Sequence, residues 1–394
     1  MRIEKISNQT EIGVIVRNHV AHLTGEPAPN KLQGVLVGVT YKGARYYYHF
    51  GQVKLYRGAS DVLIKDIVFF IGSNSKVFTA TLLALAATAA QNPVTPSTPA
   101  ASLLPSSVGM NEPCGEILLW HLATHSAGYP DGPCGPPYPF GSYPFSSMGQ
   151  FLNDFTPPYA PGKYWVYSNQ SFALLGVLLS HAYSTNVTSS GWNDSYQNWP
   201  AVVVDNVAAP LNMPSTQVDY ANVLTRVAQG YVFSDREDHP VFTPLENLPD
   251  WGLTSAGLGA GALSSTLEDM LTFLEASISP PQGALGAAMA ETQQAYPGSE
   301  GLSMGFGWQL SNDYLDKNGG LSGYQTYMAF DPVAKIGVFL FGNTSSKSPN
   351  SDPGSALDNA GRNLLGALRN SSADPSKFPK PPHNPQCPSA SGGA

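Results

Sequence analysis

The chain has 394 residues, enough to bury a substantial core, and its hydrophobic content of 42% is typical of a globular protein. Charged residues make up only 12%, whereas glycine (39) and proline (34) are abundant, so we expect an ordered protein with many loops and turns. The formal net charge of −8 argues against nucleic acid and anionic membrane as main partners, because both are bound through basic patches.

The sequence contains no apolar run of about 18 residues, so no transmembrane span is predicted. Its first residues lack the positive segment and the apolar segment of a signal peptide. We therefore expect a periplasmic or secreted protein if a leader has been removed, and a cytoplasmic one otherwise.

Cysteine usage and ligand spacing say little about a metal or redox site. Of the three cysteines, Cys114 and Cys134 lie in loop-like surroundings and either form a disulfide or remain thiols, and Cys387 is left over. No Cys/His ligand spacing occurs, so we predict no metal. No phosphate-binding Gly-Lys loop occurs either, which excludes a P-loop.

Two strand hairpins are predicted near opposite ends of the chain. Residues 34–53 form the first, with a turn at Lys42-Gly43, and residues 324–343 form the second, with a turn at Asp331-Pro332. Helices are predicted at Lys76–Gln91, Ser171–Tyr183, Ser265–Ser277 and, with an amphipathic pattern, at 355–370.

Strands near both ends and a mostly helical middle predict an α+β fold. We expect an antiparallel sheet flanked by helices, with an inserted, mainly helical domain. The predicted sheet domain is discontinuous (1–72 and 300–370), the helical domain spans 73–299, and 371–394 form a loose tail.

The segment FFIGSNSKVFTATLLALAA (69–87) places Ser73 and Lys76 three residues apart at a predicted helix start, where they share one face. The helix dipole favours an oxyanion beside a serine in this position. A partly buried lysine one turn later can lose its proton and act as a base. The alternative is Ser73 as the helix N-cap with Lys76 reaching to solvent, and this segment alone does not decide.

A second candidate nucleophile is Ser303 in GLSMG (301–305). An α/β-hydrolase elbow needs a strand before this serine and a helix after it. The flanking sequences QAYPGSE and FGWQL predict neither, so we interpret Ser303 as a chance match.

A Tyr-x-Asn pattern occurs three times, beginning at Tyr167, Tyr196 and Tyr220. The first alone follows a Pro-Gly turn and precedes a clear helix, so Tyr167 and Asn169 are expected on a rigid loop, as a preorganised site requires. Tyr167 is therefore the predicted partner in proton transfer.

A Lys-x-Gly pattern occurs twice late in the chain. Lys335 begins a hairpin strand, where a solvated turn residue is the natural interpretation. Lys317 is followed by Asn318, Gly319 and Gly320, and the glycines would let a backbone edge approach an acyl group closely. A cation there would lower the pKa of a neighbouring lysine or tyrosine and bind a substrate carboxylate.

The segments SNSK (73–76), YSN (167–169) and KNG (317–319), in this order, resemble the three motifs of the class C β-lactamases. The same motifs occur in their relatives among penicillin-binding DD-peptidases, D-aminopeptidases and β-lactamase-like esterases. The resemblance covers roughly residues 34–370 and includes LLWHLATHSAGYP (118–130), whose His121 and His125 are structural on this view.

The resemblance implies a serine hydrolase with its site between the sheet and the helical domain. Ser73 would form an acyl-enzyme, Lys76 and Tyr167 would share general-base and general-acid work, and Asn169 would orient Lys76 and the substrate amide. No cofactor is implied. The backbone N–H groups of Ser73 and Gly320 would form the oxyanion hole.

The third motif departs from the β-lactamase pattern, because Asn318 stands where those enzymes have threonine. Lys317 favours a substrate with a carboxylate, whereas Asn318 argues mildly against an efficient β-lactamase. The resemblance ranks β-lactam hydrolysis first, D-amino-acid peptide or amide hydrolysis second, ester hydrolysis third and a non-catalytic penicillin-binding module last. The partner is thus a small-molecule acyl substrate, and the sequence does not indicate an oligomeric state.

Overall fold

The computed structural model describes residues 11–58, 62–132, 142–185, 191–192, 194–235, 239–296 and 303–369. A seven-stranded sheet in the order β2-β1-β11-β10-β9-β8-β7 runs through the molecule, and all its neighbouring strands pair antiparallel. Its strands are β1 (Gly34–Tyr41), β2 (Ala44–Gly51), β7 (Ser303–Met304), β8 (Gln309–Leu310), β9 (Leu315–Leu321), β10 (Tyr324–Asp331) and β11 (Ile336–Gly342).

Two small sheets accompany the large one. Their strands are β3 (Phe69–Phe70) with β6 (Ser264–Ser265), and β12 (Thr344–Ser346) with β4 (Tyr231–Ser234) and β5 (Val241–Pro244). The α-helices are α1 (Glu11–Val20), α2 (Ser75–Ala89), α3 (Leu119–Ala123), α4 (Phe145–Asp154), α5 (Asn169–Tyr183), α6 (Trp199–Val203), α7 (Leu267–Ile278), α8 (Ala284–Thr292) and α9 (Pro353–Leu368). This mixed architecture agrees with the predicted α+β fold.

Both predicted hairpins form. In the first, Lys42 and Gly43 have positive φ angles of 51° and 82°, as a two-residue type I′ turn requires. The second joins β10 to β11 in register, with Asp331 opposite Ile336. Because β1 also pairs with β11, strands from the two ends of the chain lie side by side within the sheet.

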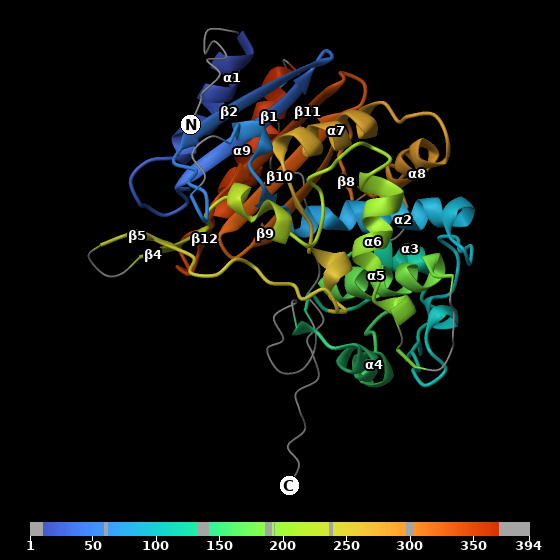
Figure 1. The fold of residues 1–394 in the computed structure, drawn as a ribbon. Coiled ribbons are helices and arrows are strands. Elements are labelled where there is room, and N and C mark those ends of the chain that lie inside the picture. The colour runs from blue at the N-terminus through green and yellow to red at the C-terminus, as the bar shows by residue number, and fades with distance from the viewer. Residues whose placement is uncertain are drawn as a thin grey trace.

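The two faces of the sheet belong to different cores. Strand alternation sends Val37 of β1 into a core shared with α1 and α9, whereas its neighbour Leu36 enters the larger core on the opposite face. Helix α7 covers that opposite face, and Leu271 approaches the sheet closely at Gly38. Figure 1 shows α3, α4 and α5 gathered beyond α2, away from the sheet.

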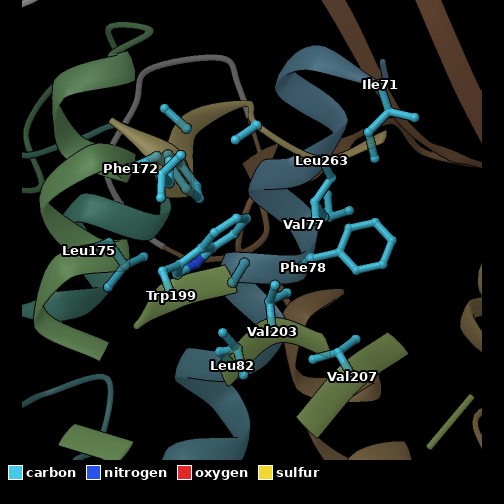
Figure 2. Close-up of a cluster of buried hydrophobic side chains, with 14 of the residues drawn as sticks. Ile71, Val77, Phe78, Leu82, Phe172, Leu175, Trp199, Val203, Val207 and Leu263 are labelled. Atoms are coloured by element: carbon cyan, nitrogen blue, oxygen red, sulfur yellow. The ribbon is translucent and has the colours of Figure 1, made fainter. Parts of the chain in front are cut away.

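Helix α2 is apolar on almost every side and lies inside the larger core, as such a helix must. Its side chains Phe78 and Leu82 pack in one cluster with Phe172 of α5 and with Trp199 and Val203 of α6 (Figure 2). Burial on all sides fixes the helix, and therefore also the short turn that precedes it.

The division into domains stays a prediction. Helix α7 belongs by sequence to the predicted helical domain (73–299), but it packs on strands β1 and β11 of the sheet. Within the described ranges, no helix combines the length and apolarity needed to cross a membrane. Cys134, Cys387 and the tail 371–394 lie outside the described residues, and the location of the protein stays a prediction.

The close contact between α9 and β10 predicts the effect of Gly361→Ala. An ideal Cβ at Gly361 would lie 2.2 Å from Cδ1 of the buried Tyr327, whose hydroxyl is held by Asp316 at 2.8 Å. Overpacking of this kind costs about 1–3 kcal/mol, so the free energy of unfolding in urea should fall. Helix propensity alone would raise it by up to about 1 kcal/mol. The exposed Asn363→Ala in the same helix is the control, and equal stabilisation by both changes would contradict the prediction.

Candidate active site

The chain turns sharply just before α2. Gly72 has a φ of +52°, and a Cβ there would lie 2.8 Å from the backbone nitrogen of Gly320, so only glycine fits. Ser73 follows in the short helical turn η3 (Gly72–Asn74), and Asn74 is the N-cap residue of α2. The alternative that Ser73 caps the helix is therefore wrong, and its hydroxyl contacts other side chains.

Lys76 is fully buried and lies at the centre of the site. Its Nζ is 2.9 Å from Ser73 Oγ, 2.5 Å from Asn169 Oδ1 and 2.5 Å from the backbone oxygen of Ala260. Burial, reinforced by the positive charge of Lys317, holds the pKa of Lys76 well below its usual value. The neutral amine, which can accept a proton, is therefore favoured.

Tyr167 is the second group in contact with the serine hydroxyl. Its hydroxyl is 2.5 Å from Ser73 Oγ and 3.3 Å from Asn169 Oδ1. Burial raises the pKa of Tyr167, so the phenol keeps its proton. The Nζ atoms of Lys76 and Lys317 lie 5.0 Å and 5.4 Å from the centre of its ring, so both amines are close to the same aromatic ring.

The loop that carries Tyr167 is held by the start of α5. Ser168 is the N-cap residue, and its Oγ accepts the backbone N–H of Ser171 at 2.9 Å. The same hydroxyl donates to the backbone oxygen of Pro130 at 2.8 Å. The loop is therefore held by Ser168, which caps α5 and also binds the loop that contains Pro130.

Asn169 connects the lysine to an acidic residue that sequence analysis missed. Its side-chain oxygen faces Lys76, and its Nδ2 donates to Asp131 Oδ1 at 2.8 Å. The backbone N–H of Asn169 donates to the backbone oxygen of Asp131 at 3.0 Å. Asp131 directly follows the segment 118–130 that supported the family resemblance, but no spacing rule relates it to the three motifs.

Lys317, on β9, is only 2% exposed. Burial lowers its pKa to about 8, although the carboxylates of Asp358 and Asp316 act in the opposite direction. Its Nζ donates to the backbone oxygen of Asn318 at 2.6 Å and lies 3.2 Å from Asn318 Oδ1. A second acidic residue missed by sequence analysis, Asp358 of α9, accepts from Asn318 Nδ2 at 2.8 Å. Burial raises the pKa of Asp358 to about 7.

The glycines after Lys317 let β9 approach the serine turn. A Cβ at Gly319 would lie 2.2 Å from the backbone oxygen of Ile71, so no side chain fits there. Leu321 pairs with Tyr324 across a two-residue turn, and antiparallel alternation then directs the N–H of Gly320 away from β10, toward η3. This is the edge that the resemblance assigns to an oxyanion hole.

Both histidines near the site hold backbone groups. His121 Nδ1 accepts the N–H of Leu118 at 2.9 Å, and His125 Nδ1 accepts the N–H of Ser168 at 3.0 Å. Burial lowers the pKa of His121 to about 4 and also lowers that of His125. Both rings therefore stay neutral at pH 7.

The other tyrosine, serine and lysine candidates from the sequence lie in different environments. The Tyr196 hydroxyl donates to the backbone oxygen of Leu103 at 3.0 Å, and the Tyr220 ring packs edge-on against Phe70. Ser303 begins strand β7 and is exposed, and Lys335 lies exposed in the turn between β10 and β11. Among the described residues, no group of three His, Cys, Asp or Glu side chains is arranged to hold a metal ion.

Comparisons with known proteins find relatives of a single family. The Beta-lactamase family model matches residues 17–361. The β-lactamase of Pseudomonas fluorescens is 25% identical over 306 residues, 76% of each chain, and that of Escherichia coli K12 is 23% identical over 374 residues, 84% of this chain and 90% of the relative.

Solved structures show the same fold. A class C β-lactamase from Rhodobacter sphaeroides superposes with a TM-score of 0.70 at 22% identity, over 92% of this chain and 100% of that one. A β-lactamase/D-alanine carboxypeptidase from Pseudomonas syringae superposes with a TM-score of 0.67 at 21% identity, over 92% and 99%.

The fold and the family match together define a serine hydrolase with the β-lactamase/transpeptidase architecture. The chain belongs to the Beta-lactamase family.

Proposed function

We propose that this serine hydrolase acts through an acyl-enzyme on Ser73, with β-lactam amides as its first-ranked substrates. The observation that carries the proposal is the position of Ser73 Oγ within hydrogen-bonding distance of both Lys76 Nζ and Tyr167 OH. A nucleophile in contact with both a base and a proton donor has the groups that acyl transfer needs.

In the acylation step, Lys76 takes the Ser73 proton while Oγ forms a bond to the substrate carbonyl carbon. The low pKa that burial imposes on Lys76 suits it as the base, and the raised pKa of Tyr167 suits it as the donor to the leaving nitrogen. The C–N bond breaks as Tyr167 gives its proton to the nitrogen, and Lys76 then passes the proton taken from Ser73 to the Tyr167 oxygen, so that both groups return to their starting state. In the second step water loses a proton to the same acid–base pair as it attacks the acyl carbon, the bond from that carbon to Oγ breaks, and Oγ regains a proton, which releases the acid and free Ser73.

The oxyanion of each tetrahedral intermediate would lie between the backbone N–H groups of Ser73 and Gly320. The close approach of β9 to η3 supports this assignment, because both amides belong to segments held within contact of each other. Backbone donors fixed in this way need no reorganisation when negative charge develops.

Lys317 would bind a carboxylate on the leaving part of the substrate, and Asn318 would help to hold it. The ammonium group of Lys317 is buried, so an anionic ligand would bind there in preference to a neutral one. This supports β-lactams and D-amino-acid peptides, which carry such a carboxylate, over simple esters. Asn318 replaces the threonine whose hydroxyl helps the β-lactamases to hold a carboxylate, and this keeps D-amino-acid peptides close behind β-lactams as the second-ranked substrates.

The nucleophile assignment predicts a single covalent adduct. After incubation with a slowly deacylating β-lactam, intact-mass analysis and peptide mapping should place one adduct on Ser73, and Ser73→Ala should abolish both the adduct and turnover. Ser75→Ala is the matched control, because Ser75 Oγ accepts the N–H of Leu263 at 3.0 Å instead of contacting Lys76. Labelling of Ser75 or Ser303, or full activity in Ser73→Ala, would refute the assignment.

Proton transfer by Tyr167 predicts a loss of kcat in Tyr167→Phe. Positioned acid–base groups contribute about a hundred- to ten-thousand-fold, and kcat should fall within that range. Tyr196→Phe and Tyr220→Phe serve as controls and should stay near wild type, since neither hydroxyl contacts Ser73. If either control loses more than Tyr167→Phe, the proton-transfer partner has been misassigned.

The carboxylate role of Lys317 predicts a selective loss in Lys317→Ala. A charged hydrogen bond contributes about 1.5–3 kcal/mol, so the ratio of kcat/KM for a cephalosporin to that for p-nitrophenyl acetate should fall roughly ten- to two-hundred-fold. Because Lys317 is cationic only below its pKa of about 8, the same ratio in the wild type should decline as the pH rises through 8.

Lys335→Asn is the control for this experiment, since Lys335 is exposed and asparagine tolerates its φ of 56°. A ratio that stays constant both in Lys317→Ala and across the pH range would exclude the carboxylate role and favour ester hydrolysis.

A further inference from the structure

We propose that Asp131 binds a cationic amine on the acyl part of the substrate, so that substrates with a free ammonium group react in preference to matched neutral ones. The inference rests on the proposed acyl-enzyme function and specifies its substrate class. The resemblance and the sequence motifs assign no role to Asp131.

The first support is the orientation of the Asn169 amide. Its oxygen contacts Lys76 Nζ and Tyr167 OH, and one of its N–H groups is taken by Asp131 Oδ1 at 2.8 Å. A substrate group that approaches this side of Asn169 therefore meets an anionic acceptor. A carbonyl oxygen would be repelled there, whereas an ammonium group would donate hydrogen bonds.

The second support is that Asp131 is held in place yet exposed. Its backbone oxygen accepts the N–H of Asn169 at 3.0 Å, and the preceding Pro130 accepts from Ser168 Oγ. The residue itself is exposed, so a ligand can reach the carboxylate. A charged group that is fixed before binding loses little freedom when the ligand arrives.

The third support is charge balance. Within the part of the chain that the structure describes, no ion pair joins Asp131 to a lysine, arginine or histidine. The nearby amine is that of Lys76, and its low pKa favours the neutral form. Although a ligand can reach the Asp131 side chain, the protein groups around it displace part of its water and raise the pKa of the carboxyl, and a bound ammonium would offset that loss of solvation.

Groups of opposite charge therefore lie on two different sides of Ser73. Lys317 lies on the sheet side and suits a carboxylate on the leaving part, whereas Asp131 lies on the helical side beside Asn169 and suits an ammonium on the acyl part. A substrate with both groups, such as a peptide with a free amino terminus or an aminated β-lactam, matches this layout.

The test compares ampicillin with benzylpenicillin, which differ only by the ammonium group on the acyl side chain. D-alanine p-nitroanilide and its N-acetyl derivative form a second matched pair. The readout is the ratio of kcat/KM for the cationic and neutral members or, where deacylation is slow, the ratio of their acylation rates by intact mass. The wild type should prefer the cationic member, and Asp131→Asn should lower the ratio about ten- to a hundredfold.

Asparagine at this position keeps an oxygen that accepts from Asn169 and removes only the charge. Asp154→Asn makes the same charge change on the exposed end of α4 and should leave the ratio at its wild-type value. An equal loss for both members of a pair in Asp131→Asn would show that Asp131 acts only by orienting Asn169, and would overturn the proposal. So would a wild type that prefers neutral substrates or shows no preference.

Failure of the proposed function has a different signature. If hydrolysis persists in Ser73→Ala, or if no probe acylates Ser73, the acyl-enzyme assignment fails and the inference fails with it. If hydrolysis depends on Ser73 but the ratio does not respond to Asp131→Asn, the inference alone fails.

Discussion

The buried amine of Lys76 is the group around which the site is organised. It lies within 2.9 Å of oxygens from three segments, which are the serine turn, the start of α5 and the backbone at Ala260. An amine removed from water is costly unless such partners surround it, so the fold must bring these segments together. The same burial lowers the pKa of the amine. Burial of Lys76 therefore both requires the three segments to meet and makes the amine able to act as a base.

Close backbone approach is the second condition of the site. Glycines at 72 and 319 allow η3 and β9 to lie against each other, and Thr326 ties them by donating to the backbone oxygen of Ile71 at 2.9 Å. Helix α2 is in turn immobilised by the core shown in Figure 2. The reacting groups thus sit on rigid elements, which keeps their relative positions within the tolerance that catalysis requires.

Two carboxylates border the site. Asp358 of α9 accepts from Asn318, the neighbour of Lys317, and Asp131 accepts from Asn169. Each carboxylate contacts the amide of an asparagine, and that asparagine in turn contacts a lysine. Each carboxylate fixes the orientation of its asparagine amide. The amide carries no charge, so each lysine has a fixed polar neighbour that does not neutralise it.

The sequence by itself determined the hairpins, the long helices and the three motifs, because turn chemistry, periodicity and short spacings are local properties. It also placed Tyr167 ahead of Tyr196 and Tyr220, since a turn and a helix start flank it. Only the tertiary structure decided that Asp131 and Asp358 border the site and that Ala260 contacts the lysine. Those contacts join residues 38 to 184 positions apart, and no local pattern encodes a distance that the packing of a whole core sets.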